Sequence, residues 1–215
     1  MVYIVEESDV QGLIFDCDGT LCDTMPAYYH SWTMVCEKYG LEISEPEFYG
    51  MAGVPVRDMI QKLIDKAGKG DSLTVQEVFE TKCVFGFEAM KKMGAPGIPC
   101  VIDIARKYHG KVPLAVASSG NREHVHKSLE DAGIHELFDA IITCEDVTNP
   151  KPAPDIYLKA AAAIKCDPTK CRGFEDGDVG MESLVAAGME AVDVRYMSDY
   201  PRDINGMRGS IAPGR

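Results

Sequence analysis

Short apolar runs alternate with helical segments from residue 95 onward, and this alternation limits the possible folds more than any other feature. The apolar runs are typical of buried strands, and the segments between them repeat apolar residues at helical spacing. The predicted strands are residues 12–15, 112–120, 139–146, 171–178 and 190–196. The predicted helices are residues 101–110, 122–133, 154–165 and 179–189. Strand and helix repeated in this order predict an α/β fold, a parallel sheet covered by helices on both faces.

A helical region interrupts this alternation after the first strand. Apolar residues at helical spacing predict helices over 26–40, 55–70 and 74–94, and no strand pattern occurs among them. Segments rich in proline and glycine follow this region, which indicates a boundary. We therefore expect one domain made of residues 1–24 and 95–215, with residues 25–94 inserted into it as a separate helical domain.

Composition and charge exclude several classes of protein. The net charge of −12 is unlike the basic stripe that a nucleic-acid groove needs, and it disfavours anionic membrane surfaces. No apolar run approaches the length of a membrane-spanning helix, and the N-terminus has no signal-peptide pattern. The eight cysteines are scattered without a C-x-x-C pair, as in reduced intracellular proteins. We expect a cytoplasmic monomer that binds neither nucleic acid nor membranes.

Polar and charged residues follow the ends of the predicted strands. Asp16 and Asp18 come directly after the strand 12–15, and residues two apart in an extended segment point to the same side. In an open parallel sheet the carboxyl ends of the strands meet at one edge, where ligands bind. We therefore expect one site that gathers Asp16, Asp18, Ser118, Ser119, Lys151, Glu175 and Asp176.

The carboxylates in this group predict a metal site. Like charges a few ångströms apart raise one another's pKa and destabilise the fold unless a cation joins them. Oxygen ligands favour Mg²⁺, and a lysine with nearby hydroxyls suits a phosphoryl group. Each residue also has an ordinary structural explanation, such as a helix cap at Ser118 or Asn121 and a solvated side chain at Lys151. Their place at the same ends of successive strands favours the site.

Four segments resemble the motifs of the haloacid dehalogenase-like hydrolases. They are "DCDGTL" from Asp16, the hydroxyl of Ser118, Lys151 in "KPAPDIY", and "FEDGDVGMESLVAAGM". Their order and spacing match that family over residues 11–195, and "KPAPD" and "GMEAVDVR" resemble fructose-1-phosphate phosphatases of its β-phosphoglucomutase-like subgroup. The resemblance implies a Rossmann-like core, a small α-helical bundle cap at residues 25–94, Mg²⁺ and phosphate-monoester chemistry.

The residues suggest a role for each side chain, partly on the strength of that resemblance. Asp16 is the nucleophile that forms an aspartyl phosphate, and Asp18 is the general acid and base. Ser118, Ser119 and Lys151 bind the transferring phosphoryl group. The predicted metal ligands are Asp16, Asp18 through its backbone carbonyl, Glu175 and Asp176. Gly53 and Arg122 are further candidates for substrate binding.

Two other functions compete with a phosphatase for small sugar or polyol phosphates. A phosphomutase would use the same aspartyl phosphate, and a phosphate-sensing receiver module also pairs acidic residues with a lysine on a parallel sheet. The helical insertion and Asp18 have no use in a simple receiver. In β-phosphoglucomutases a histidine and a lysine couple cap closure to the general acid, and Tyr28 and Ala52 occupy those positions here. We therefore expect hydrolysis of a phosphate ester.

Overall fold

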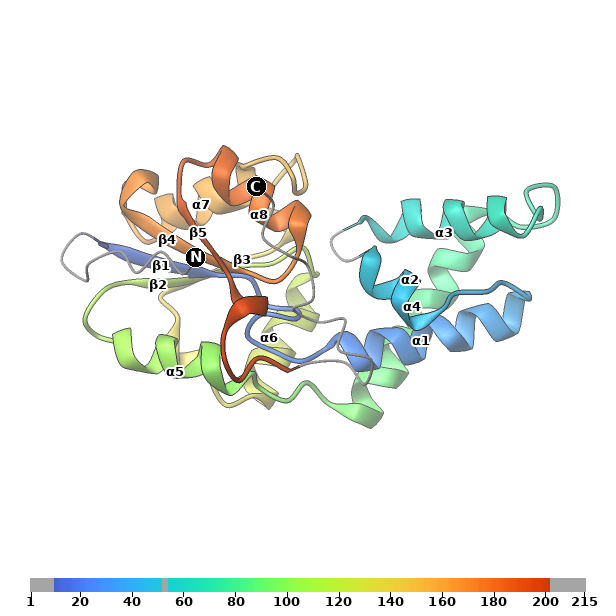
Figure 1. Cartoon of the computed structure of the whole chain (residues 1–215), viewed down its shortest axis with the longest axis horizontal. Coiled ribbons are helices and arrows are strands. Elements are labelled where there is room, and N and C mark those ends of the chain that lie inside the picture. The colour runs from blue at the N-terminus through green and yellow to red at the C-terminus, as the bar shows by residue number, and fades with distance from the viewer. Residues whose placement is uncertain (1–9, 52–53, 202–215) are drawn as a thin grey trace. The chain divides into compact units, whose positions relative to one another are not determined.

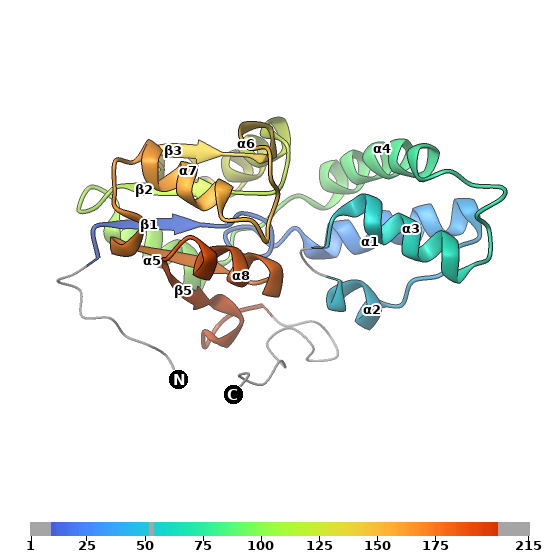
Figure 2. The ribbon, with the colours of Figure 1, turned by 90° about the horizontal axis from the view of Figure 1, so that it is seen from above.

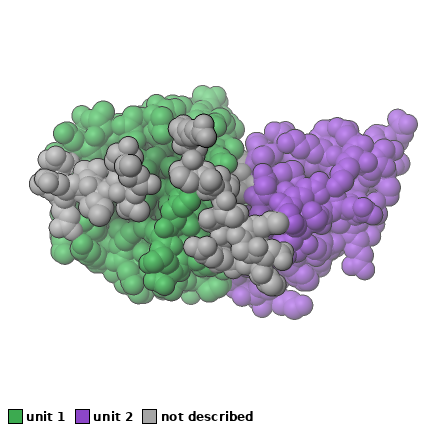
Figure 3. Space-filling model, viewed as in Figure 1, with its two compact units in different colours: residues 1–23, 96–215 green, residues 24–95 purple. Residues whose placement is uncertain are grey.

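The computed structural model describes residues 10–51 and 54–201. The chain divides into two compact units, which Figure 3 colours separately. The first unit combines residues 1–23 with residues 96–215, and the second unit is residues 24–95. The chain therefore leaves the first unit after one strand and returns to it after about seventy residues.

The first unit is built on a parallel sheet of five strands, as the sequence predicts. The strands are β1 (Gly12–Phe15), β2 (Leu114–Ala117), β3 (Ala140–Ile142), β4 (Cys171–Glu175) and β5 (Glu190–Asp193). Their order across the sheet is β3-β2-β1-β4-β5, and Figure 2 shows β3, β2, β1 and β5 in that sequence. Strand β1 is central and all four of its residues are buried, which explains its apolar composition.

Helices cover both faces of this sheet. They are α5 (Pro99–Tyr108), α6 (Arg122–Asp131), α7 (Asp155–Ala163) and α8 (Asp178–Ala186). Figure 1 shows α7 and α8 on one face and α5 and α6 on the other. The connections with α5 and α6 run across the sheet from β1 to β3, and those with α7 and α8 run in the opposite direction, from β3 to β4 and on to β5. Right-handed crossovers therefore place the two pairs of helices on opposite faces.

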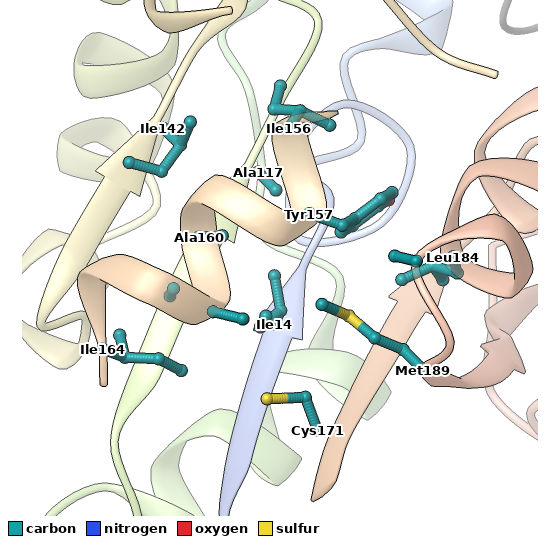
Figure 4. Packing of buried hydrophobic residues seen from close by; sticks show 13 residues of the cluster. Ile14, Ala117, Ile142, Ile156, Tyr157, Ala160, Ile164, Cys171, Leu184 and Met189 are labelled. Atoms are coloured by element: carbon teal, nitrogen blue, oxygen red, sulfur yellow. The ribbon is translucent and has the colours of Figure 1, made fainter. Parts of the chain in front are cut away.

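One apolar layer of the first unit lies between the sheet and helices α7 and α8. In Figure 4, Ile14 of β1 faces Tyr157 of α7, and Leu184 of α8 and Met189 lie beside them. Tyr157 is fully buried, and its hydroxyl reaches the carboxyl end of the sheet. Burial of a large apolar side chain stabilises a fold by about 1.5–3 kcal/mol, so this layer fixes the strands that carry the site.

The second unit is entirely helical among its described residues. It contains α1 (Met25–Tyr39), α2 (Glu45–Gly50), α3 (Val56–Lys66) and α4 (Val75–Met93) around one apolar cluster. Helices α1, α3 and α4 correspond to the three predicted ones. Helix α2 is additional: the Glu47 amide donates to Ser44 Oγ, and the Ser44 amide donates to the Glu47 carboxylate. The residues of this capping box are present in the sequence. Helix α2 was not predicted, because it is short and buries only Phe48.

Two further properties concern the chain as a whole. All eight cysteines are free thiols. Across residues 10–51 and 54–201, none of the helices combines the length and the apolar character that crossing a bilayer requires.

Candidate active site

The site lies at the carboxyl ends of β1, β2 and β4. The order of the strands reverses at β1, which is the position where open α/β sheets form a binding crevice. Phe15 pairs with Val116 on one side and with Phe174 on the other. Asp16, which follows Phe15, therefore lies between Ala117 at the end of β2 and Glu175 at the end of β4.

Lys151 joins two buried carboxylates at this edge. Its Nζ donates to Asp16 Oδ1 at 2.7 Å and to Glu175 Oε1 at 2.6 Å. None of these three residues is more than 7% exposed. The loop after β3 thus brings the predicted lysine to the predicted aspartate, and the three charged groups form the charged cluster together with Asp176.

Glu175 is held by both of its carboxylate oxygens. The hydroxyl of Tyr157 donates to Oε1 at 2.9 Å, in addition to Lys151. The backbone amides of Asp176 and Gly177 donate to Oε2, each at 2.9 Å. Four donors therefore fix this side chain, which leaves it little freedom to change its orientation.

Asp176 is positioned by the turn that follows β1. Thr20 Oγ1 donates to Asp176 Oδ1 at 3.2 Å. Gly19 has a φ of +84°, and a Cβ on it would lie 2.2 Å from Asp176 Oδ2. Residue 19 must therefore be glycine both for its left-handed backbone and for the carboxylate packed against it.

Burial and neighbouring charges perturb the pKa values of the charged cluster. Burial raises the pKa of Asp16 well above its ordinary value, against the attraction of Lys151 and with the repulsion of Glu175. Burial and then Glu175 raise the pKa of Asp176 to about 7. Burial by itself lowers the pKa of Lys151, but Asp16 and Glu175 outweigh it and leave that pKa above its ordinary value. Such shifts are typical of functional sites, because few folds bury like charges without a use for them.

Three carboxylates of the cluster fit a divalent metal ion. One oxygen from each of Asp16, Glu175 and Asp176 lies within 4.8 Å of the others. The donors are all oxygen atoms, which Mg²⁺ prefers over nitrogen and sulfur. The side chain of Asp18 is not in this group. Its backbone carbonyl, the predicted ligand atom, stays a prediction.

Asp18 and Ser118 both lie close to Gly120. A Cβ on Gly120 would be 3.3 Å from Asp18 Oδ2 and 3.2 Å from Ser118 Oγ. Ser118 is buried, and its Oγ accepts a hydrogen bond from the Gly120 amide at 3.0 Å. Ser119 is exposed on the same loop. The motif residues after β1 and β2 thus come near each other at Gly120.

The two candidates for substrate binding remain predictions. The guanidinium of Arg122 is exposed and donates to Asp146 Oδ1 at 2.9 Å, with Glu145 on its other side at 3.5 Å. It is therefore paired with carboxylates outside the charged cluster. Gly53 lies outside the described residues, as does Ala52.

Comparison with known proteins identifies the family. The family model of the haloacid dehalogenase-like hydrolases matches residues 13–194. The chain belongs to this family. It is 33% identical over 188 residues to the fructose-1-phosphate phosphatase of Escherichia coli K12, covering 86% of this chain and 97% of that protein. It is 30% identical over 185 residues to a phosphorylated carbohydrates phosphatase of Thermotoga maritima, with coverage of 85% and 84%.

A solved structure shares the fold. A β-phosphoglucomutase of Clostridium difficile superposes with a TM-score of 0.71 at 23% identity, covering 86% of this chain and 84% of that one. The α/β core with a helical region, the β-phosphoglucomutase-like subgroup and the enzyme class, a phosphatase of the haloacid dehalogenase-like type, are confirmed.

Sequence reasoning missed two contacts within this haloacid dehalogenase-like core. Tyr157 donates to Glu175, although in the sequence it is one apolar residue among several on helix α7. His124 lies 3.0 Å from Asp18 Oδ1, although no histidine was among the predicted site residues. The "KPAPDIY" segment could have pointed to Tyr157, whereas nothing in the sequence around His124 distinguishes it from its neighbour His126.

Proposed function

We propose that the protein is a Mg²⁺-dependent phosphatase that hydrolyses a small sugar or polyol phosphate through an aspartyl phosphate on Asp16. The buried charged cluster carries this proposal. A carboxylate follows the central strand, a buried lysine neutralises it, and two further carboxylates lie within reach of the same ion. The proposal also assigns residues 24–95 as the cap that selects the substrate.

The first step transfers the phosphoryl group to the enzyme. An oxygen of Asp16 attacks phosphorus, and the bond from phosphorus to the ester oxygen breaks. Asp18 gives its proton to the departing alkoxide, which leaves as the free alcohol. Splitting the displacement in this way replaces one difficult reaction by two easier ones.

The second step returns the enzyme to its starting state. Water attacks phosphorus and gives a proton to Asp18, while the bond from phosphorus to Asp16 breaks and phosphate is released. One carboxylate thus acts first as an acid and then as a base, and its side chain is not one of the three grouped for a metal ion.

Several groups would stabilise the charge that develops in both steps. Lys151 lies against Asp16 and would offset charge on the nucleophile and on the phosphoryl oxygens. Ser118, which is buried beside Asp18, would bind a phosphoryl oxygen, as would the backbone of Ser119. Mg²⁺ held by Asp16, Glu175 and Asp176, with the Asp18 carbonyl, would neutralise phosphoryl charge and orient the phosphorus for attack.

The substrate class comes from the relatives. The two bacterial phosphatases described above, by their names, act on phosphorylated sugars, and they match this chain over more than four fifths of its length. A net charge of −12 repels anions at long range, so the phosphoryl group depends on Lys151 and the metal.

A phosphomutase is the second candidate, because a solved β-phosphoglucomutase shares the fold. Such an enzyme must keep its aspartyl phosphate from water. In those enzymes a histidine and a lysine couple cap closure to the general acid, and this chain has Tyr28 and Ala52 at the corresponding positions. The Tyr28 ring does have a cation beside it, since Lys82 Nζ lies 5.4 Å from its centre. That amine comes from helix α4 and not from the position of the mutase histidine.

Product analysis separates the two candidates. The protein would be given fructose 1-phosphate and, separately, β-glucose 1-phosphate with and without the bisphosphate primer, all with Mg²⁺. We expect free phosphate from fructose 1-phosphate and no accumulation of glucose 6-phosphate. Glucose 6-phosphate forming much faster than free phosphate would make the protein a mutase. Undiminished phosphate release in excess chelator would exclude the metal.

A further inference from the structure

Asp18 has a side-chain partner on the helix that follows β2. His124 Nε2 lies 3.0 Å from Asp18 Oδ1, and both side chains are only 18% exposed. While Oδ1 carries no proton it can only accept a hydrogen bond, and Nε2 then carries the hydrogen and donates it. We propose that His124 is a positioning residue that holds the carboxylate of Asp18 in place for proton transfer to the leaving group. This inference rests on the proposed function, in which Asp18 is the general acid.

The backbone of His124 is fixed by the start of helix α6. Asn121 caps this helix, and its Oδ1 accepts a hydrogen bond from the His124 amide at 2.9 Å. The next residue, Val125, is completely buried, which sets the rotation of the helix. The imidazole is therefore carried by a rigid element, as a group that must orient another side chain requires.

The second oxygen of Asp18 lies near the loop that carries Ser118. His124 occupies Oδ1, while Oδ2 is 3.3 Å from the point where a Cβ of Gly120 would be. Ser118 Oγ is 3.2 Å from that same point. The second oxygen of Asp18 and the hydroxyl proposed to bind the phosphoryl group therefore both lie close to Gly120.

A positioning role predicts a dependence on the leaving group. An alkoxide from a sugar phosphate needs a proton as it departs, so a misplaced Asp18 slows the first step. A phenolate from p-nitrophenyl phosphate departs without one. The ratio kcat/KM depends only on the steps up to and including the first irreversible one. It therefore reflects proton donation to the leaving group and not the later attack of water. Loss of folding would lower kcat/KM for both esters by the same factor.

The test compares His124→Ala and His124→Gln with the wild type on fructose 1-phosphate and p-nitrophenyl phosphate. His126→Ala is the matched control, because its imidazole contacts His135 at 2.8 Å and not Asp18. For His124→Ala we expect kcat/KM on the sugar ester to fall about 10-fold or more, with a change of at most about 2-fold on the aryl ester. His124→Gln, whose amide can donate in place of Nε2, should recover most of the loss.

Other outcomes decide against the inference. An equal loss on both esters, no recovery with glutamine, or a faster reaction of His124→Ala on the sugar ester would overturn it. Asp18→Asn measured in parallel separates this from failure of the proposed function. If Asp18→Asn abolishes turnover of the sugar ester while His124→Ala retains the wild-type rate, only the role of His124 is wrong. If Asp18→Asn retains the rate, the proposed function is wrong and the role of His124 with it.

Discussion

At the scale of single residues, the charge of Asp16 is disfavoured by some of its surroundings and favoured by others. Its burial and the nearby carboxylates of Glu175 and Asp176 disfavour its charge, and only Lys151 contacts it with the opposite charge among the interactions described above. We expect Asp16→Asn to lower turnover by at least about 10³-fold, because the nucleophile is lost. We expect the metal-free variant to melt at the same or a higher temperature, because a like charge is removed while Lys151 keeps Glu175. Phosphate release and thermal melting of one sample check both parts, and near-normal turnover would remove Asp16 as nucleophile.

Substitution of Tyr157 tests whether the hydrogen bond to Glu175 supports metal binding. The tyrosine hydroxyl donates to Glu175 Oε1, and phenylalanine would keep the buried ring but lose this donor. We expect Tyr157→Phe to weaken Mg²⁺ binding by about 10-fold, as loss of a hydrogen bond to a metal-binding group usually does. Titration calorimetry with Mg²⁺ measures this directly. Tyr196→Phe, at an exposed tyrosine far along the chain, is the control. Unchanged affinity in Tyr157→Phe would contradict the assignment of Glu175 as a ligand.

The sequence predicted that Asp16, Lys151 and Glu175 meet, but not how each is held. Strand ends and motif spacing were enough to bring Asp16, Lys151 and Glu175 together. The contacts of Tyr157 and His124 depend on how far helices α7 and α6 are rotated about their axes. Packing against the sheet sets that rotation, and local spacing along a helix gives only which residues share a face.

At the scale of elements, the sequence located the strands well, but it predicted that some of them extend further along the chain than they do. The last strand was expected over 190–196, yet β5 ends at Asp193. There the Asp193 carboxylate accepts a hydrogen bond from the Arg195 amide at 3.0 Å, which turns the chain into a short 3₁₀ segment. A side chain that bonds its own backbone competes with the ladder of the sheet, and alternating apolarity does not reveal it.

Helix α4 carries a buried amine, that of Lys82. Lys82 is 6% exposed, and its Nζ lies 5.4 Å and 5.3 Å from the ring centres of Tyr28 and Trp32 on α1. Burial lowers its pKa to about 8. The charged form is thus disfavoured in the folded state, and this cost is fully present below the folded pKa. The attraction between the ammonium and the aromatic rings offsets part of it.

Replacing this amine should stabilise the protein. We expect Lys82→Met to raise the free energy of unfolding by about 1–2 kcal/mol near neutral pH, since methionine fills similar space without charge. The gain should shrink as the pH rises from about 8 toward 10.5, because the lysine of the wild type then becomes neutral in both states. Denaturant unfolding across this range measures it. Lys62→Met, at an exposed position of α3, should change little, and an equal gain there would contradict the explanation.

At the scale of the whole molecule, the charged cluster links stability to pH and to the metal. A carboxyl group whose pKa is higher in the folded than in the unfolded state stabilises the fold at low pH. That stabilisation is lost as the pH rises from the unfolded to the folded value. For Asp176 this interval runs from 3.8 to about 7, and the pKa of Asp16 is raised in the same direction. The metal-free cluster therefore opposes folding most strongly at neutral pH and above, where Mg²⁺ finds its ligands deprotonated.

Thermal melting with and without Mg²⁺ tests this linkage. We expect Mg²⁺ to raise the melting temperature by more at about pH 8 than at about pH 5.5, because at the lower pH protons compete for the same carboxylates. In metal-free protein, Asp176→Asn should stabilise the fold near pH 8 and have little effect near pH 5.5, because it replaces a carboxyl that is mostly protonated there. The same variant should lose most of the gain from Mg²⁺. A gain from Mg²⁺ that is equal at both pH values, or that survives in Asp176→Asn, would show that the ion stabilises the protein from another site.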